Sequence, residues 1–240
     1  MRLFPAFYDL VMTRAERGRF GEFRKENVSP ARGVIIEVGA GSGLNFRHYS
    51  PGVDVVATDP DAETLASRAR PRVAGSAANI MLVAADAQLL PFRDAAFDEG
   101  VAALAMCTIP EPRRALAELR RTVRPLGVVR LLEHVRVRRP LIAQLQDWLT
   151  PIWRHVAEGC HLNRRVTDDV VGAGLAIERV DEHLGGHVQR IIARVPDVTG
   201  APALRPVTAD STAPPSADST VLPSVRLAQR TPMYGRNWRS

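Results

Sequence analysis

The chain has few cysteines and no long apolar run. Its 240 residues include only two cysteines, Cys107 and Cys160, which lie far apart and lack the spacing typical of metal ligands. The sequence therefore predicts neither a structural disulfide nor a metal site. No stretch of about 18 apolar residues is present, and the start, Met1 to Pro5, lacks the apolar core of a signal peptide. A cytoplasmic location is expected.

Lysine is almost absent, because Lys25 is the only one in the chain. A phosphate-binding loop needs a lysine directly after its last glycine, so that class of nucleotide site is excluded. The net charge of +6 comes almost entirely from arginine. This mild excess agrees with attraction to anionic surfaces, but no nucleic-acid-binding module accompanies it. We expect no nucleic-acid partner and no obligate protein partner.

A glycine-rich turn is the most informative feature that the chain does have. It follows the apolar run 34–36 and consists of Glu37, Val38, Gly39, Ala40, Gly41, Ser42 and Gly43. Glycine tolerates positive φ and has no Cβ, so the backbone can turn sharply and lie directly against a ligand. A helix is expected to begin at Leu44. The dinucleotide-binding pattern is weakened, because its third glycine comes one residue early.

Two further apolar runs end in acids. The run 53–59 ends in Asp59, followed by Pro60, and the run 79–84 leads to Asp86 and Ala87. A carboxylate at Asp59 can accept hydrogen bonds from two ribose hydroxyls, although an N-cap of the next helix is the alternative. Asp86 and the Ala87 amide could bind an adenine, although Asp86 alone would also suit a turn.

The order of elements predicts an α/β fold, a Rossmann-like doubly wound sheet with helices on both faces. We expect a helix over 61–70, a strand with its exit loop over 97–108, a helix that starts at 110–112, a strand over 128–134, a helix or loop over 141–158, and an antiparallel pair of strands over 176–181 and 187–195. Three parts are expected: an N-terminal helical segment (1–30), a catalytic domain (31–195) and a disordered tail rich in Pro, Ser, Thr and Ala (196–240).

The N-terminal segment suggests a helix over 6–26 with one apolar and one basic side. One interpretation is a helix that packs on the domain or lies over a cofactor. The other is peripheral contact with a membrane surface or an apolar substrate. Tyr8 is our candidate from this helix for the substrate pocket.

Together, these motifs resemble the class I S-adenosylmethionine (SAM) dependent methyltransferases, and more narrowly the subgroup of the methyltransferase-like 7 proteins and their bacterial relatives. The subgroup marks include Asn45-Phe46, Asp59-Pro60, Cys107 to Pro110, Glu133-His134 and Gly159-Cys160. The resemblance implies a seven-stranded sheet with an antiparallel last strand. It implies SAM as cofactor, bound by Glu37, Gly39, Ala40, Gly41, Gly43, Asn45, Asp59, Pro60, Asp86, Ala87 and Cys107.

Two positions depart from that family's pattern. Glu99 and Gly100 interrupt what should be a buried parallel strand. Leu126 stands where a glycine is usual, and a positive φ there would cost about 1–2 kcal/mol. Both departures concern stability more than cofactor chemistry.

The resemblance also implies an acceptor that is a small molecule or lipid-like: a thiol, a phospholipid head group or a quinone precursor. His134 is the candidate general base, although a hydrogen bond to the next loop would explain it as well. Trp148, Trp153 and Cys160 are candidates for an apolar acceptor pocket, but plain core residues would look the same. A SAM-binding protein without catalysis and a nicotinamide-dependent reductase stay open as alternatives.

Overall fold

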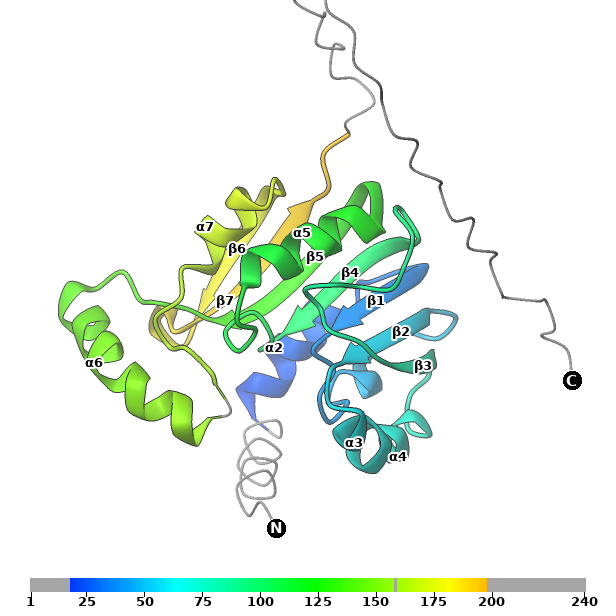
Figure 1. Cartoon of the computed structure of the whole chain (residues 1–240), viewed down its shortest axis with the longest axis horizontal. Coiled ribbons are helices and arrows are strands. Elements are labelled where there is room, and N and C mark those ends of the chain that lie inside the picture. Colours follow the sequence, from blue (N-terminus) through cyan, green and yellow to red (C-terminus); the bar gives the residue numbers. More distant parts are fainter. Residues whose placement is uncertain (1–17, 158, 198–240) are drawn as a thin grey trace, which may run out of the picture. The chain divides into compact units, whose positions relative to one another are not determined.

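A seven-stranded sheet forms the centre of the computed structural model, which describes residues 18–157 and 159–197. The chain divides into a unit Met1–Ala201 and a unit Pro202–Ser240, and the second unit lies outside the described residues. The strand order is β3-β2-β1-β4-β5-β7-β6 (Figure 1). The strands are β1 (Val34–Val38), β2 (Asp54–Asp59), β3 (Asn79–Ala84), β4 (Phe97–Ala103), β5 (Val123–His134), β6 (Ala176–His183) and β7 (Val188–Arg194).

The directions of the strands confirm the predicted doubly wound sheet. Strands β1 to β5 pair in parallel, whereas β7 is antiparallel to both β5 and β6. Chain order reverses between β1 and β4, which are neighbours in the sheet. In open α/β sheets, a crevice forms at the carboxyl ends of the strands at such a reversal. The topology therefore places a binding crevice directly after β1, at the glycine turn.

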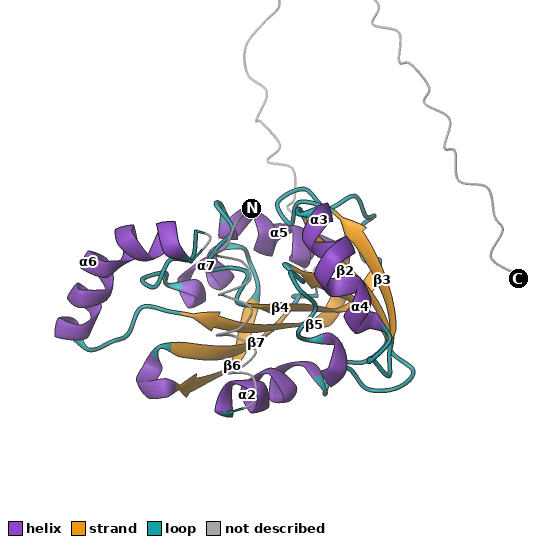
Figure 2. Ribbon diagram, turned by 90° about the horizontal axis from the view of Figure 1, so that it is seen from below, coloured by secondary structure: helices purple, strands orange, loops and turns teal. Residues whose placement is uncertain are grey.

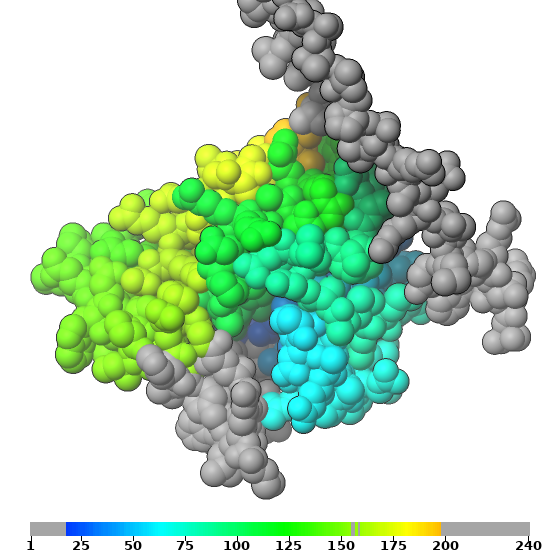
Figure 3. Space-filling view, viewed as in Figure 1, coloured from blue at the N-terminus to red at the C-terminus, as the bar shows by residue number. Residues whose placement is uncertain are grey.

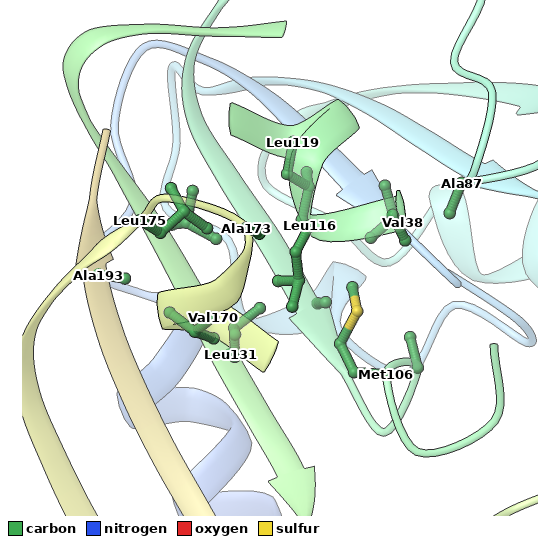
Figure 4. Close-up of a cluster of buried hydrophobic side chains, with 14 of the residues drawn as sticks. Val38, Ala87, Met106, Leu116, Leu119, Leu131, Val170, Ala173, Leu175 and Ala193 are labelled. Carbon is green, nitrogen blue, oxygen red and sulfur yellow. The ribbon is translucent and has the colours of Figure 1, made fainter. Parts of the chain in front are cut away.

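Helices cover both faces of the sheet. One face carries α5 (Pro112–Thr122) and α7 (Val166–Gly172), and the other carries α2 (Arg19–Val28) (Figure 2). Leu116 and Leu119 of α5 pack with Val170 of α7 in a core cluster that continues onto the central strands (Figure 4). A second cluster joins Val28 of α2 to Leu65 and Ala69 of the helical run after β2. The apolar periodicity of α5 accounts for its place.

Several boundaries differ from those predicted. The α-helix expected at Leu44 is absent, and only a short 3₁₀ turn, η1 (Phe46–His48), forms there. The Gly43 backbone hydrogen bonds tighten this segment, since Gly43 N donates to Ala40 O and Gly43 O accepts from Phe46 N. The helix expected over 61–70 extends to Val73 as α3 (Ala62–Thr64), the π-helical η2 (Leu65–Ala69) and α4 (Arg70–Val73). A 3₁₀ turn, η3 (Leu184–Gly186), joins β6 to β7.

The ends of the chain are only partly described. The helix predicted over 6–26 appears as α2, which begins at Arg19 and continues to Val28. Residues 6–17, Tyr8 among them, lie outside the described residues, and so does the predicted tail from residue 198 onward. The segment over 141–158, left open as helix or loop, is the helix α6 (Pro140–Val156). Within the described ranges, no helix combines the length and the apolar character needed to cross a membrane.

The two departures from the family pattern have structural explanations. Glu99 of β4 forms an ion pair of 2.7 Å with Arg130 of the adjacent strand β5, so its charge is compensated. A Cβ at Gly100 would lie 3.1 Å from Leu119 Cδ2, so glycine lets α5 pack closely on β4. Leu126 does have a positive φ, of 62°, and its strain is about 1–2 kcal/mol.

Candidate functional site

The candidate site is a cavity of about 440 Å³ at the carboxyl ends of the parallel strands. Figure 3 shows a hollow on this face, between the cyan and green parts of the surface. We call the part after β1, β2 and β3 the cofactor side; it is lined by Gly39, Ala40, Gly41, Ser42, Leu44, Asn45, Asp59, Pro60, Asp86, Ala87 and Gln88. We call the part after β4 and α6 the acceptor side; it is lined by Leu104, Ala105, Thr108, Ile109, Pro110 and Ala157.

The glycine turn brings bare backbone to the cavity. Gly39 and Gly41 have φ of 67° and 52°, values that L side chains rarely adopt. A Cβ at Gly39 would lie 2.5 Å from Ala105 Cβ, so glycine allows the turn to touch the loop after β4. Nothing lies within 4 Å of a Cβ built at Gly41. That open space is where a ligand can lie against the backbone.

A buried hydrogen-bond network lies beneath the turn. Glu37 does not line the cavity; its carboxylate accepts hydrogen bonds of 2.8 Å from Asn45 Nδ2 and from the Tyr49 hydroxyl. Arg24 of α2 donates to Asn45 Oδ1 at 2.7 Å and itself lines the cavity. Burial raises the pKa of Glu37, against the effect of the two side-chain hydrogen bonds. Glu37 therefore holds the turn in place from below.

Asp59 lies at the end of β2 and on the cavity wall. Its carboxylate accepts hydrogen bonds from Gly41 N at 2.9 Å and from Asp61 N at 3.0 Å. Burial raises its pKa, while these two amides act in the opposite direction. The carboxylate ties the glycine turn to the second strand and keeps lone pairs for hydroxyl donors. The helix N-cap after it is Asp61, whose side chain accepts from Glu63 N and Thr64 N.

The loop after β3 completes the cofactor side. Asp86 accepts hydrogen bonds from Gln88 N at 2.8 Å and from Gln88 Nε2 at 3.0 Å. Gln88 in turn accepts from Glu111 N at 3.0 Å, which links this loop to the start of α5. Ala87 is buried beside them. Asp86 and Ala87 can together offer a carboxylate acceptor and an amide donor to an adenine ring.

The acceptor side is apolar and is supported by a buried carboxylate. Leu104 has a φ of 58°, a strained conformation that turns the chain away from β4 toward the cavity wall. Behind the wall, Glu133 accepts hydrogen bonds from Ala105 N, Met106 N and Cys107 N at 3.1, 3.0 and 3.2 Å. Burial raises the pKa of Glu133 to about 7, although the three amides lower it. Glu133 thus holds the loop that forms this wall.

The two cysteines meet although they lie far apart in the sequence. The Sγ atoms of Cys107 and Cys160 are 3.5 Å apart, and Cys160 Sγ lies 3.7 Å from His134 Nδ1. Their mutual hydrogen bond and burial raise the pKa of Cys107, and the same bond, aided by His134, lowers the pKa of Cys160. Cys107, Cys160 and Ala157 pack together with Leu104 against them. This cluster lies directly behind the wall of the acceptor side.

The remaining candidates lie away from the cavity. Trp148 has 71% of its surface exposed and Trp153 has 40%, and neither lines the cavity. The Trp153 side chain is instead hydrogen-bonded to Cys160. His134, Cys107 and Cys160 are also absent from its lining, and so are Glu37 and Gly43. A Cβ at Gly43 would lie 2.5 Å from the Phe46 ring, so Gly43 shapes the turn instead.

Sequence reasoning assigned no site role to the residues that line the acceptor side, and it also missed three polar or charged residues of the site. Arg24 and Gln88 line the cavity, and Glu133 supports its wall. Arg24 comes from a helix for which only an amphipathic pattern was available. An acid in the predicted apolar strand 128–134 was the one signal that could have identified Glu133, since buried carboxylates need hydrogen-bond donors.

The residues that line the cavity fit SAM. The space beside Gly41 accommodates a group that approaches bare backbone, such as the amino-acid part of the cofactor. Asp59 and Asp86 offer carboxylates on successive strand ends, as a ribose and an adenine require.

Comparisons with known proteins point to the same cofactor. Residues 36–131 match the family described as "Methyltransferase domain". The chain is 28% identical over 164 residues to thiol S-methyltransferase TMT1B of Rattus norvegicus, an alignment that covers 66% of each protein. It is 37% identical over 120 residues to phosphatidylethanolamine N-methyltransferase of Cereibacter sphaeroides, which covers 49% of this chain and 59% of that protein. The chain thus spans about two thirds of the first relative's length and less of the second's.

Solved structures agree on the fold. The SAM-dependent methyltransferase of Aquifex aeolicus superimposes with a TM-score of 0.51 at 18% identity, over 68% of this chain and 81% of that one. At this sequence identity, the structural similarity shows the fold alone. The match to the methyltransferase domain family includes the glycine turn, Asp59 and Asp86. Because sequence and fold converge on the same cavity, the chain belongs to the class I SAM-dependent methyltransferases and uses S-adenosyl-L-methionine as its cofactor.

Proposed function

We propose that the enzyme transfers the SAM methyl group to the sulfur of a small apolar thiol. The observation that carries the proposal is the division of the cavity lining. Carboxylates and bare backbone line its cofactor side, whereas the acceptor side is mostly apolar and consists of Leu104, Ala105, Thr108, Ile109, Pro110 and Ala157. The similarity to a thiol S-methyltransferase over two thirds of the chain favours sulfur among apolar acceptors.

For methyl transfer from a sulfonium, the main task of the protein is to position the acceptor. Bound SAM supplies a methyl group on a sulfonium, whose departure leaves a neutral thioether. The protein must hold the acceptor about 3–3.5 Å from that methyl carbon, on the line opposite the sulfonium. The apolar wall excludes water and so favours a desolvated sulfur nucleophile.

The acceptor must also lose its proton. His134 was our candidate base, but it does not line the cavity, and its Nδ1 faces Cys160. We therefore assign no proton transfer to it. A free alkyl thiol with a pKa near that of cysteine is a few per cent thiolate at neutral pH. We expect the thiol to release its proton to solvent, so that the rate rises with pH toward the pKa of the acceptor.

A panel of acceptors tests the proposal. The full-length protein is incubated with methyl-labelled SAM and, separately, with alkyl thiols of increasing length, phosphatidylethanolamine and a quinol. We expect label on the thiols. Labelling of phosphatidylethanolamine or the quinol, with none on any thiol, would contradict the choice of sulfur while leaving the methyltransferase assignment intact.

A cavity variant tests where the acceptor lies. Ala157→Leu fills space on the acceptor side and leaves the cofactor side unchanged. We expect KM for long alkyl thiols to rise by about tenfold, the effect of about 1.4 kcal/mol, and KM for the shortest thiol to change little. Equal effects on both thiols, or a loss of SAM affinity by calorimetry, would place the acceptor elsewhere.

We further propose that the enzyme reaches apolar acceptors at an anionic lipid surface, through α6. One side of this helix exposes Leu141, Leu145, Trp148 and Ile152, at spacings that put them on one face. The exposed arginines Arg138, Arg139 and Arg154 flank the two ends of the helix, and the chain has a net charge of +6. An apolar face with basic flanks is typical of helices that lie in a membrane interface.

Sedimentation with vesicles tests this contact. We expect the protein to sediment with vesicles that contain phosphatidylserine and to bind less to purely zwitterionic ones. Trp148→Ser should weaken binding, whereas Trp238→Ser, in the C-terminal tail, serves as the matched control. Equal binding by wild-type protein and Trp148→Ser, or concentration-dependent dimerisation without vesicle binding, would refute a lipid contact through α6.

A further inference from the structure

Three potential metal ligands converge behind the acceptor side. Cys107 follows β4, His134 ends β5, and Cys160 follows α6. One ligand atom from each lies within 4.8 Å of the other two. We call this group the Cys-His cluster. Neither the methyl transfer described above nor the cofactor contacts use these three side chains.

Two of the three distances between ligand atoms in the cluster match those of a tetrahedral zinc site, and the third is no longer than 4.8 Å. With Zn–S bonds of about 2.3 Å and Zn–N bonds of about 2.0–2.1 Å, tetrahedral angles put two sulfurs about 3.8 Å apart and a sulfur and nitrogen about 3.6 Å apart. The structure has 3.5 Å between Cys107 Sγ and Cys160 Sγ, and 3.7 Å between Cys160 Sγ and His134 Nδ1. Small side-chain movements would therefore complete the coordination geometry.

Hydrogen bonds hold the three segments in register. His161 N donates to Cys107 O at 2.8 Å, which joins the loop after β4 to the segment that follows α6. Cys107 N donates to Glu133 at 3.2 Å, beside His134 on β5. Cys160 N donates to Ala157 O at 2.9 Å. Metal sites gain affinity from such supporting contacts, because the ligands need not be ordered on binding.

Burial and charge favour a divalent, borderline-soft cation. Cys107 and Cys160 are buried and His134 is half-buried. Two thiolates and a neutral imidazole are ligands that zinc prefers. When both thiols bind as thiolates, their two protons go to solvent, and the two negative charges balance the charge of Zn²⁺. The occupied site itself would therefore carry no net charge.

We propose that the Cys-His cluster binds one Zn²⁺ ion through Cys107 Sγ, Cys160 Sγ and a ring nitrogen of His134. Three protein ligands leave one tetrahedral position for a water molecule or an exogenous thiolate, as in catalytic rather than closed structural zinc sites. The ion would clamp the end of α6 to β4 and β5, and so fix the wall behind Leu104 and Ala157. This inference does not depend on which acceptor the enzyme methylates.

Metal binding can be measured without SAM or an acceptor. The reduced, metal-free, full-length protein is titrated with Zn²⁺ against a chromogenic chelator, and with Co²⁺ as a spectroscopic substitute. We expect one Zn²⁺ per chain, a rise in the unfolding temperature on binding, and a Co²⁺ spectrum with thiolate charge-transfer bands and the intense visible bands of tetrahedral coordination.

Variants assign the ligands. Cys160→Ser and His134→Gln should each weaken Zn²⁺ binding by at least about 100-fold, the upper end of what changes beside a metal ligand cost. His161→Gln is the matched control, because His161 Nδ1 lies 3.2 Å from the Cys107 carbonyl oxygen and outside the cluster; its Zn²⁺ affinity should stay within about threefold of wild type. Retained SAM affinity and circular dichroism show that each variant folds.

Two results would overturn the proposal. One is Zn²⁺ affinity that is unchanged in both Cys160→Ser and His134→Gln. The other is that the reduced wild-type protein binds no Zn²⁺ and that air oxidation lowers its mass by two hydrogens. That result would mean that Cys107 and Cys160 form a disulfide instead. If no thiol in the acceptor panel is methylated, neither the zinc proposal nor the disulfide alternative is affected.

Discussion

The cofactor side and the acceptor side of the cavity are built in different ways. On the cofactor side, successive strands β1, β2 and β3 each end in a short motif, and the parallel sheet lines these motifs up. On the acceptor side, the wall combines the loop after β4 with Ala157 at the end of α6, and Glu133 holds that loop from behind. One side is therefore assembled from local motifs, and the other from long-range contacts.

This difference predicts which residues tolerate change. A substitution on the cofactor side should alter SAM binding and leave the fold nearly intact, because each motif contributes a few contacts to the ligand. A substitution in the support of the acceptor side should first destabilise the protein, because several buried groups share one partner. The following predictions test this contrast.

The largest effect is expected for Glu133→Ala. The substitution leaves three buried amides, of Ala105, Met106 and Cys107, without their acceptor. We expect a loss of about 3–5 kcal/mol in the free energy of unfolding, measured by urea titration. Glu63→Ala, an exposed acid on α3, is the control and should change stability by less than about 0.5 kcal/mol. A similarly small loss for Glu133→Ala would show that the acceptor side does not depend on this carboxylate.

Asp59→Asn should weaken SAM binding without unfolding the protein. An amide has one oxygen acceptor where the carboxylate has two, and it lacks the charge that strengthens hydrogen bonds from the ribose hydroxyls. We expect a loss of about 2–3 kcal/mol in binding free energy, or ~30- to 150-fold in Kd by calorimetry. Asp61→Asn, which keeps a good N-cap, should bind SAM as wild type does.

The same pair of variants tests the pH dependence. Burial raises the pKa of Asp59 above its ordinary value of 3.8, so this carboxylate takes up a proton at a higher pH than a free aspartate. Because the ionised form is the better acceptor for hydrogen bonds from ribose hydroxyls, we expect SAM affinity to be full at neutral pH and to fall as the pH drops through the raised pKa. Asp59→Asn should remove most of that dependence. An unchanged pH profile would mean that Asp59 does not bind the ribose.

Gly41→Ala and Gly52→Ala form a matched pair. Both glycines have positive φ and nothing within 4 Å of a built Cβ, but only Gly41 lines the cavity. Each substitution should cost about 1–2 kcal/mol of stability through backbone strain. Only Gly41→Ala should also raise the Kd for SAM, by about tenfold (about 1.4 kcal/mol), because its methyl group occupies ligand space. Equal Kd values would show that the cofactor does not lie against the turn.

The smallest effect is expected for Leu126→Gly, at a site remote from both sides of the cavity. Glycine relieves the strain of a φ of 62°, worth about 1–2 kcal/mol, but costs about 0.5–1 kcal/mol in backbone entropy. We expect a net gain of about 0.5 kcal/mol in urea unfolding. Leu89→Gly, at a more exposed leucine without positive φ, should instead destabilise the protein. A loss of stability for Leu126→Gly would mean that the Leu126 side chain contributes packing energy.

The cofactor side was largely predictable because its signals are local. A glycine turn after an apolar run implies positive φ and bare backbone, and the observed φ of Gly39 and Gly41 agree. Acids at the ends of strands predicted to be parallel must lie along one edge of the sheet, and Asp59 and Asp86 do line one cavity. The residues of each motif were therefore enough to predict where the chain turns at the edge of the sheet.

The acceptor side depended on contacts that no local pattern contains. The sequence separation of Cys107 and Cys160 argued against any joint role, yet β4, β5 and the segment after α6 bring them to 3.5 Å of each other beside His134. Trp148 matched the pattern of a pocket residue but faces outward, because α6 buries Ala143, Gln146 and Thr150 instead. The presence of an aromatic residue does not predict which way its side chain points. Which side of a helix is buried depends on the element that packs against it.

The sequence by itself determined the sheet, its turn and the cofactor, because backbone preferences and strand periodicity act over a few residues. Only the tertiary structure decided which side chains pack behind the cavity wall. It also decided that Glu133 accepts hydrogen bonds from three amides and that two cysteines and a histidine lie in contact. Those arrangements arise when distant segments pack together, and the residues involved satisfy each other's polar groups only in the folded chain.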